Sequence, residues 1–166
     1  MEFTHYLDNL EKRLAGSFDL ERDYLIDDYK FDLFAKYLLR NEKYVLIKQA
    51  KIYTIENNEY SFIKYFNKID RDQLDKFIAL LIKSIDFLIQ PSEEHMSSIV
   101  TGVIATPDKP DSDIINAIKK FKYHKGFAFG FKGWVDIRLL LVTMKDDYIV
   151  TNKKGKEVSK VYSINY

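Results

Sequence analysis

Cysteine is missing from this sequence, and proline and glycine are scarce, with 3 and 6 among 166 residues. Without thiols the chain forms no disulfide, performs no thiolate chemistry and offers no cysteine ligand to zinc or an iron–sulfur cluster. Histidine occurs only at His5, His95 and His124, which disfavours a histidine-rich metal centre. We therefore predict neither a bound metal nor a cofactor.

Long apolar segments are also missing. No apolar run approaches the roughly 18 residues that a helix needs to span a bilayer. The first residues, MEFTHYLDNLEKRL, lack the basic-then-apolar order of a signal peptide. These two absences predict a cytoplasmic location with no membrane partner.

Aromatic side chains, by contrast, are abundant, with 12 Phe, 12 Tyr and 1 Trp. Each ring removes about 150–250 Å² from water when it is buried, so these residues are enough for a large core. The length is close to the commonest domain size. We expect one domain over residues 1–166, with residues 1–28 as an N-terminal helix and acidic segment and residues 153–166 as a tail.

The net charge of +1 hides an asymmetry between the two ends of the chain. Residues 1–30 contain eight acids and four bases, a net charge of −4, whereas residues 119–166 contain eleven bases and four acids, a net charge of +7. The two ends can neutralise each other within one molecule or between two copies. The basic end can also serve an anionic partner.

Hydrophobic periodicity predicts the secondary structure. A 4-3-4 spacing before Gly16 indicates a helix over 3–14, and residues 17–28 read as irregular. Asp70 and Gln73 have capping-box spacing at the start of a long apolar stripe that Pro91 ends, and the stripe has to cover a sheet face. A third helix is expected from Asp111 or Ser112. The expected strands, with turns at 41–42 and 56–58, are 31–39, 44–55, 59–66, 97–106, 125–131, 134–144 and 148–152.

The predicted order is therefore α-βββ-α-β-α-βββ. The first three strands form an antiparallel meander, and the later strand–helix–strand units favour parallel pairing. The fold class is α+β, a mixed sheet with helices packed on it.

The most distinctive segment is residues 119–134, which contains no carboxylate between Asp113 and Asp136. Lysines attract phosphates, aromatic rings stack on bases, and glycines let a ligand approach the backbone. The segment also fits a structural interpretation, in which Phe127, Phe129 and Phe131 share the core face of a strand and the first lysines offset a helix macrodipole. The candidate anion-binding residues are Lys119, Lys120, Lys122, His124, Lys125 and Lys132.

A second group of candidates is polar residues on apolar strands. Asp136 and Arg138 share one face of the strand over 134–144, and Lys64 shares a face with three aromatic residues. These residues indicate a buried polar site, an ion pair that specifies the fold, or a lysine at a sheet edge. His124 has no serine or carboxylate near it in the sequence that would complete a catalytic triad, so we predict no catalytic residues.

Three functions remain open. The leading hypothesis is a non-enzymatic binding module for nucleic acid or an acidic protein. The second is a metal-dependent hydrolase or a degenerate nuclease-like protein, because helix, three strands, helix and strand is the core order of PD-(D/E)xK nucleases. The lysine of that motif would be Lys64, but Phe62 stands where the motif has an acid. The third is a homodimer or larger homo-oligomer held by its oppositely charged ends.

Overall fold

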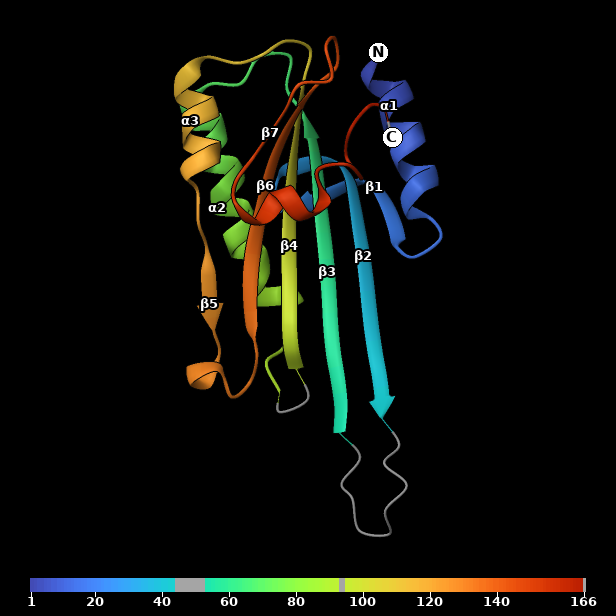
Figure 1. Ribbon diagram of the computed structural model, residues 1–166, viewed down its shortest axis with the longest axis vertical. Coiled ribbons are helices and arrows are strands. Elements are labelled where there is room, and N and C mark those ends of the chain that lie inside the picture. The colour runs from blue at the N-terminus through green and yellow to red at the C-terminus, as the bar shows by residue number, and fades with distance from the viewer. Residues whose placement is uncertain (44–52, 93–94, 166) are drawn as a thin grey trace.

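The computed structural model describes residues 1–43, 53–92 and 95–165. Its centre is a seven-stranded mixed sheet in the order β1-β2-β3-β4-β6-β5, with β7 also paired to β6 (Figure 1). The predicted fold class and element order are confirmed. The helices are α1 (Phe3–Leu14), α2 (Arg71–Leu88) and α3 (Ser112–Lys120), with 3-10 turns η1 (Ala128–Gly130) and η2 (Lys154–Val158). The strands are β1 (Asp19–Ile26), β2 (Tyr29–Lys43), β3 (Tyr53–Tyr65), β4 (His95–Thr106), β5 (His124–Gly126), β6 (Trp134–Thr143) and β7 (Ile149–Thr151).

Connection length explains the direction of each strand. Strands β1, β2 and β3 form an antiparallel meander. The chain then crosses over through α2 and returns in β4, which pairs parallel to β3. A second crossover through α3 places β6 parallel to β4. Short strands β5 and β7 both pair antiparallel to β6. The middle of the sheet is therefore parallel and both of its sides are antiparallel.

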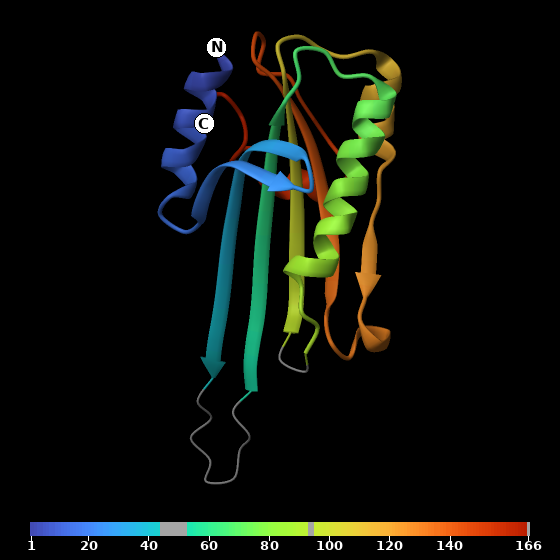
Figure 2. The same cartoon turned by 180° about the vertical axis from the view of Figure 1, so that it is seen from behind.

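The larger core lies between the sheet and helices α2 and α3, which cover the same face (Figure 2). Helix α2 begins with the predicted capping box, in which the Asp70 carboxylate accepts from the Gln73 backbone and the Gln73 side chain accepts from the Asp70 backbone. Its apolar stripe, including Leu74, Phe77 and Leu81, is buried against β4 and its neighbours. The prediction that this stripe covers a sheet face is thus confirmed.

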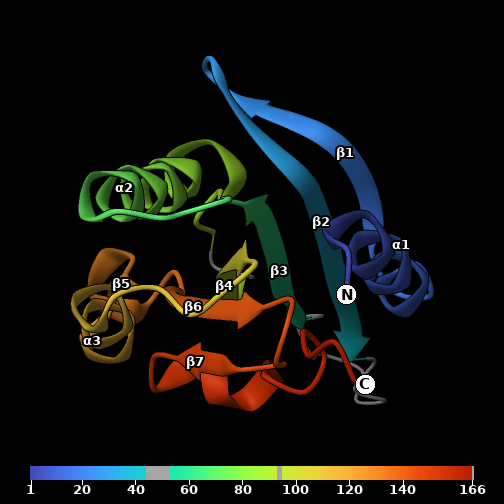
Figure 3. The same cartoon turned by 90° about the horizontal axis from the view of Figure 1, so that it is seen from above.

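A smaller core covers part of the opposite face. Helix α1 and the chain after β7 pack there, with α2 and α3 on the other side (Figure 3). Residues 153–165 are therefore not the tail that we predicted. Tyr162 is 3% exposed, its hydroxyl is 2.8 Å from the Ser61 hydroxyl, and its carbonyl accepts from Tyr6. The apolar residues of this C-terminal segment anchor it to the sheet, although they are spaced without a regular period.

Two predictions about the meander are wrong. Residues 19–26, which we expected to be irregular, form the edge strand β1. Few of its side chains are buried, so charged residues stand at both faces and the sequence shows no alternation of apolar and polar residues. The turns at 41–42 and 56–58 are also absent, since β2 and β3 continue through them as paired strands. Most of the expected strand over 44–55 lies outside the described residues.

The expected core strand over 125–131 is wrong as well. Strand β5 ends at Gly126, and the chain then forms the tight turn η1. Phe129 is fully exposed and Phe131 is 85% exposed, whereas only Phe127 packs against the larger core. Alternating phenylalanines resemble a strand in the sequence, but the positive φ angles of Ala128, Phe129 and Gly130 break the extended conformation.

Gly102 on β4 allows α2 to approach the sheet closely. A Cβ atom there would clash with Leu81 Cδ1 and would lie 2.8 Å from Phe77 Cε1. We expect Gly102→Ala to lower the free energy of unfolding by about 1–3 kcal/mol, because the two side chains must leave their packed positions. Urea unfolding measures the change. Gly16→Ala is the matched control, because its new methyl group would meet no atom within 4 Å. Equal stability of the two variants would contradict the proposed close packing.

Burial raises the pKa of Tyr162 to about 12, from an ordinary value of 10.0. Between these values the unfolded chain loses a proton that the folded chain keeps, so stability is complete below pH 10 and falls as the pH rises toward 12. This group contributes a slope of up to about 1.4 kcal/mol per pH unit. We expect the alkaline loss of unfolding free energy to be less steep in Tyr162→Phe than in the native chain. Parallel slopes in urea titrations over this range would refute the assignment.

Candidate functional site

The candidate site lies where the edge of β6 is divided between two short strands. Strand β5 pairs with residues 134–136 of β6, and β7 pairs with residues 140–142. The β6 backbone between them bonds to residues outside any strand. Ile137 N donates to Tyr123 O at 3.3 Å, and Asn152 N donates to Leu139 O at 3.0 Å. The two segments that flank this edge of β6 diverge here and leave a pocket between them.

The Asn152 side chain holds this opening in shape. Its Oδ1 accepts from Leu139 N at 3.1 Å and from Gly155 N at 2.8 Å, while Nδ2 donates to Ile137 O at 3.0 Å. Asn152 is 2% exposed, so these bonds satisfy buried backbone groups that water does not reach. One amide group therefore replaces the missing piece of strand.

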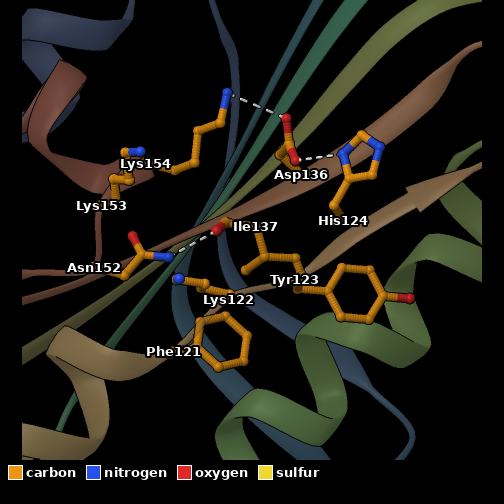
Figure 4. Close-up of a pocket in the computed structure, with 9 residues that line it drawn as sticks. All are labelled: Phe121, Lys122, Tyr123, His124, Asp136, Ile137, Asn152, Lys153 and Lys154. Atoms are coloured by element: carbon orange, nitrogen blue, oxygen red, sulfur yellow. Dashed lines mark hydrogen bonds and ion pairs between the residues drawn. The ribbon is translucent and has the colours of Figure 1, made fainter.

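The pocket encloses about 290 Å³ between residues 121–124 on one side and 152–154 on the other (Figure 4). The rings of Phe121 and Tyr123 lie in the lower part of Figure 4, and His124 and Asp136 lie in the upper part. Partial burial and the charge of Asp86 raise the pKa of Tyr123. The full lining is Phe121, Lys122, Tyr123, His124, Asp136, Ile137, Asn152, Lys153 and Lys154.

Asp136 is the buried acid of the pocket, with a side chain that is 10% exposed. His124 Nδ1 lies 2.8 Å from Asp136 Oδ1, and Lys154 Nζ lies 3.3 Å from Asp136 Oδ2. A carboxylate only accepts hydrogen bonds, so Nδ1 of His124 is assigned as the donor and Nε2 is the ring nitrogen that is not committed to Asp136. This carboxylate beside His124 was not expected from the sequence, because only the antiparallel β5–β6 register brings positions 124 and 136 together.

Arg138 extends this charged group along the same face of β6. Its side chain is 7% exposed and lies 3.3 Å from Glu59 and 3.0 Å from Glu157, and Glu157 also lies 3.9 Å from Lys154. Charges of alternating sign thus connect β5, β6, η2 and β3.

Lys64 does not belong to this group. It lies on the α2 face, 3.7 Å from Asp32 and 5.9 Å from the centre of the Tyr29 ring.

The five predicted lysines are divided among five places, two of which adjoin. Lys122 lines the pocket and Lys119 lines the adjoining hollow of about 670 Å³, which it shares with Lys153 and Lys156. Lys120 lines a different hollow, beside Arg71 and Asp113. Lys125 lies 3.9 Å from Asp86 and 5.5 Å from the centre of the Phe127 ring. Lys132 follows η1 in the turn before β6.

Three further lysines from the segment that we predicted to be a tail lie at the site, namely Lys153, Lys154 and Lys156. They lie in and beside η2, next to Lys119 and Lys122. The signal was present in the run KKGK, but nothing local in that run shows which part of the fold it packs against. The β6–β7 hairpin brings it back to the end of α3.

In residues 1–43, 53–92 and 95–165, no three histidine or acidic side chains come close enough together to hold a metal ion. The helices of this part of the chain include none with the length and apolar character needed to cross a membrane.

The fold and pocket define a mixed α+β domain with a lysine-lined opening at one edge of its sheet. The chain belongs to the family described as a domain of unknown function, DUF8052, which matches residues 2–164. A search of curated proteins finds no match.

Asn152→Ala should destabilise the folded chain. The substitution leaves Leu139 N, Gly155 N and Ile137 O without partners, and each buried unsatisfied group costs about 1–3 kcal/mol. We expect a total loss of about 2–4 kcal/mol in urea unfolding, since some of these groups regain water. Asn152→Asp should recover only part of this loss, because one carboxylate oxygen still accepts from both N–H groups but the other replaces the donor to Ile137 O. A loss below 1 kcal/mol for the alanine variant would show that Asn152 is not the support of this edge.

Proposed function

We propose that this protein is a non-enzymatic binding module, and that the lysine-lined pocket beside β6 binds phosphate groups of an anionic partner. The observation that carries the proposal is the meeting of two basic segments, 119–122 and 153–156, around one opening. We call the five lysines involved the basic cluster: Lys119, Lys122, Lys153, Lys154 and Lys156.

The charge at the opening favours an anion. Three lysines line the pocket beside one carboxylate, Asp136. That carboxylate is held between His124 and Lys154 at hydrogen-bonding or ion-pair distance, so much of its charge is compensated within the protein. Lys122 and Lys153 are exposed on opposite sides of the opening. Their charges can act on a ligand.

The size and lining of the pocket favour a small group of a larger partner. A volume of 290 Å³ is at the lower end of the range for ligand sites, which extends from about 300 to 1,000 Å³. Phe121, Tyr123 and Ile137 provide apolar surface beside the lysines. A phosphate group with part of an attached sugar or ring fits this combination better than an isolated inorganic ion does.

Two other functions have weaker support. A hydrolase would use the His124–Asp136 pair as a general base, since Nε2 of the ring is left free to accept a proton. The nuclease-like element order also supports this alternative, although Glu59 and Lys64 lie on opposite faces of the sheet.

A homo-oligomer would join the acidic N-terminal residues to the basic cluster. Within one chain, Asp8 and Glu11 instead pair with Arg22, and Asp27 pairs with Lys83.

Neutralising two lysines at the pocket should weaken the binding of a polyanion, and the loss of affinity should be largest at low salt. For Lys122→Gln/Lys153→Gln we expect at least tenfold weaker binding of a short inorganic polyphosphate and of single-stranded oligothymidylate at about 50 mM salt. The slope of log affinity against log salt should fall by about 1–2, because each phosphate contact releases a counterion. Fluorescence titration between about 50 and 200 mM salt measures both quantities.

Lys12→Gln/Lys120→Gln is the matched control, because it removes the same charge from α1 and from the separate hollow beside Arg71. It should bind both probes like the native chain. Equal losses in the two double variants would mean that net charge, not the basic cluster, governs binding. No binding of either probe at low salt would refute the proposed function, and selective binding of an acidic peptide would assign the surface to a protein partner.

A further inference from the structure

The turn between β5 and β6, which we call the aromatic tip (residues 127–134), presents large apolar side chains to water. Phe129 is fully exposed, Phe131 is 85% exposed and Trp134 is 36% exposed. Exposed aromatic rings are unfavourable in water unless a partner covers them, and several together indicate an interaction site. Phe127 alone turns toward the core, where it anchors the tip.

The aromatic tip is an ordered structure. Phe127 N donates to Gly133 O at 2.8 Å, and the Phe127 carbonyl accepts from Gly130 N at 2.9 Å and Lys132 N at 3.1 Å. Gly130 and Gly133 have φ angles of 89° and 85°, which suit glycine, but Ala128 and Phe129 also have positive φ angles, at 47° and 56°. Such a backbone is unfavourable for residues with a side chain and persists only when its surroundings impose it. The hydrogen bonds therefore hold two phenylalanine rings away from the core.

The aromatic tip is continuous with the lysine-lined pocket. His124, which lines the pocket, and Lys125 belong to β5, which leads directly into the tip. From His124 to Ala128 there are four residues, on the order of 13 Å in an extended chain. Lys125 and Lys132 lie between the rings in the sequence, and residues 114–135 contain no carboxylate. A partner that reaches from the pocket to the tip would meet positive charge first and exposed rings next.

We propose that the aromatic tip is a stacking platform for the bases of a single-stranded nucleic acid whose phosphates lie at the basic cluster. This inference rests on the proposed function and adds the class of partner to it. Lysines that follow a phosphate backbone, together with aromatic rings that stack on successive bases, are the combination by which proteins bind single strands without sequence preference. A duplex fits the tip poorly, because its base faces are already covered by stacking.

Trp134 gives a direct measurement of this contact, because it is the only tryptophan in the chain and lies at the base of the tip. A base that stacks nearby should quench its fluorescence, whereas inorganic polyphosphate has no ring and should not. We therefore expect single-stranded oligothymidylate to quench Trp134 and to bind at least tenfold more tightly than a duplex of the same length or a polyphosphate of matched charge.

Removal of the two exposed rings tests the platform separately from the pocket. For Phe129→Ala/Phe131→Ala we expect ten- to hundredfold weaker binding of oligothymidylate, loss of the Trp134 quenching, and unchanged binding of polyphosphate. Phe129→Tyr/Phe131→Tyr should restore binding because it restores the rings. Leu25→Ala is the control for loss of an exposed apolar side chain, since Leu25 is 59% exposed on β1 at the opposite edge of the sheet. Urea unfolding verifies that each variant is folded.

The outcomes separate this inference from the proposed function. If polyphosphate binds but oligothymidylate binds no better than duplex, or if the alanine variant loses nothing, the stacking platform is refuted and the phosphate pocket stands. If neither probe binds, both are refuted. Vesicles of phosphatidylcholine and phosphatidylserine provide the remaining comparison. Vesicle binding that depends on Phe129 and Phe131, without binding of oligothymidylate, would assign the tip to a lipid surface and overturn the inference.

Discussion

The hydrogen bonding of β6 is the constraint on which the rest of this structure depends. One edge of β6 pairs with β4 along its whole length, but the other edge is divided between β5, the Asn152 side chain and β7. Every buried backbone group on that edge needs a partner, and no single strand supplies them all. The division opens the pocket, and it also places η2 beside the end of α3.

A second consequence is the unequal covering of the two sheet faces. Helices α2 and α3 cover one face, while α1 and the C-terminal segment cover only part of the other. Where this second cover ends, the inward positions of β6 change from Leu140 and Val142 to Arg138 and Asp136. Neighbouring acids and bases neutralise these buried charges, which is the condition under which a protein interior tolerates them.

The functional surface combines segments with different local roles. Lys119 is a helix C-terminal residue that offsets a macrodipole, and Lys153 and Lys154 belong to a tight turn. Neither role by itself implies a ligand. Their convergence at one opening provides the argument, together with an adjoining turn whose hydrogen bonds direct Phe129 and Phe131 toward water. Charge and exposed aromatic area, on neighbouring parts of one surface, are what a polyanion with stacked rings requires.

The sequence alone determined the element order, the capping box of α2, the apolar stripe that covers the sheet, and the absence of thiol chemistry. These features depend on local periodicity and composition, which can be recognised in the sequence without knowledge of any long-range contact. The sequence alone did not determine the exposure of Phe129 and Phe131. The spacing of the phenylalanines is the same whether the segment is a buried strand or a turn with positive φ angles. Only the tertiary structure joined His124 to Asp136, separated Lys120 from Lys122, and brought Lys153 and Lys154 into the site. Those relations depend on strand register and on packing between residues distant in sequence, for which a single chain carries no local signal.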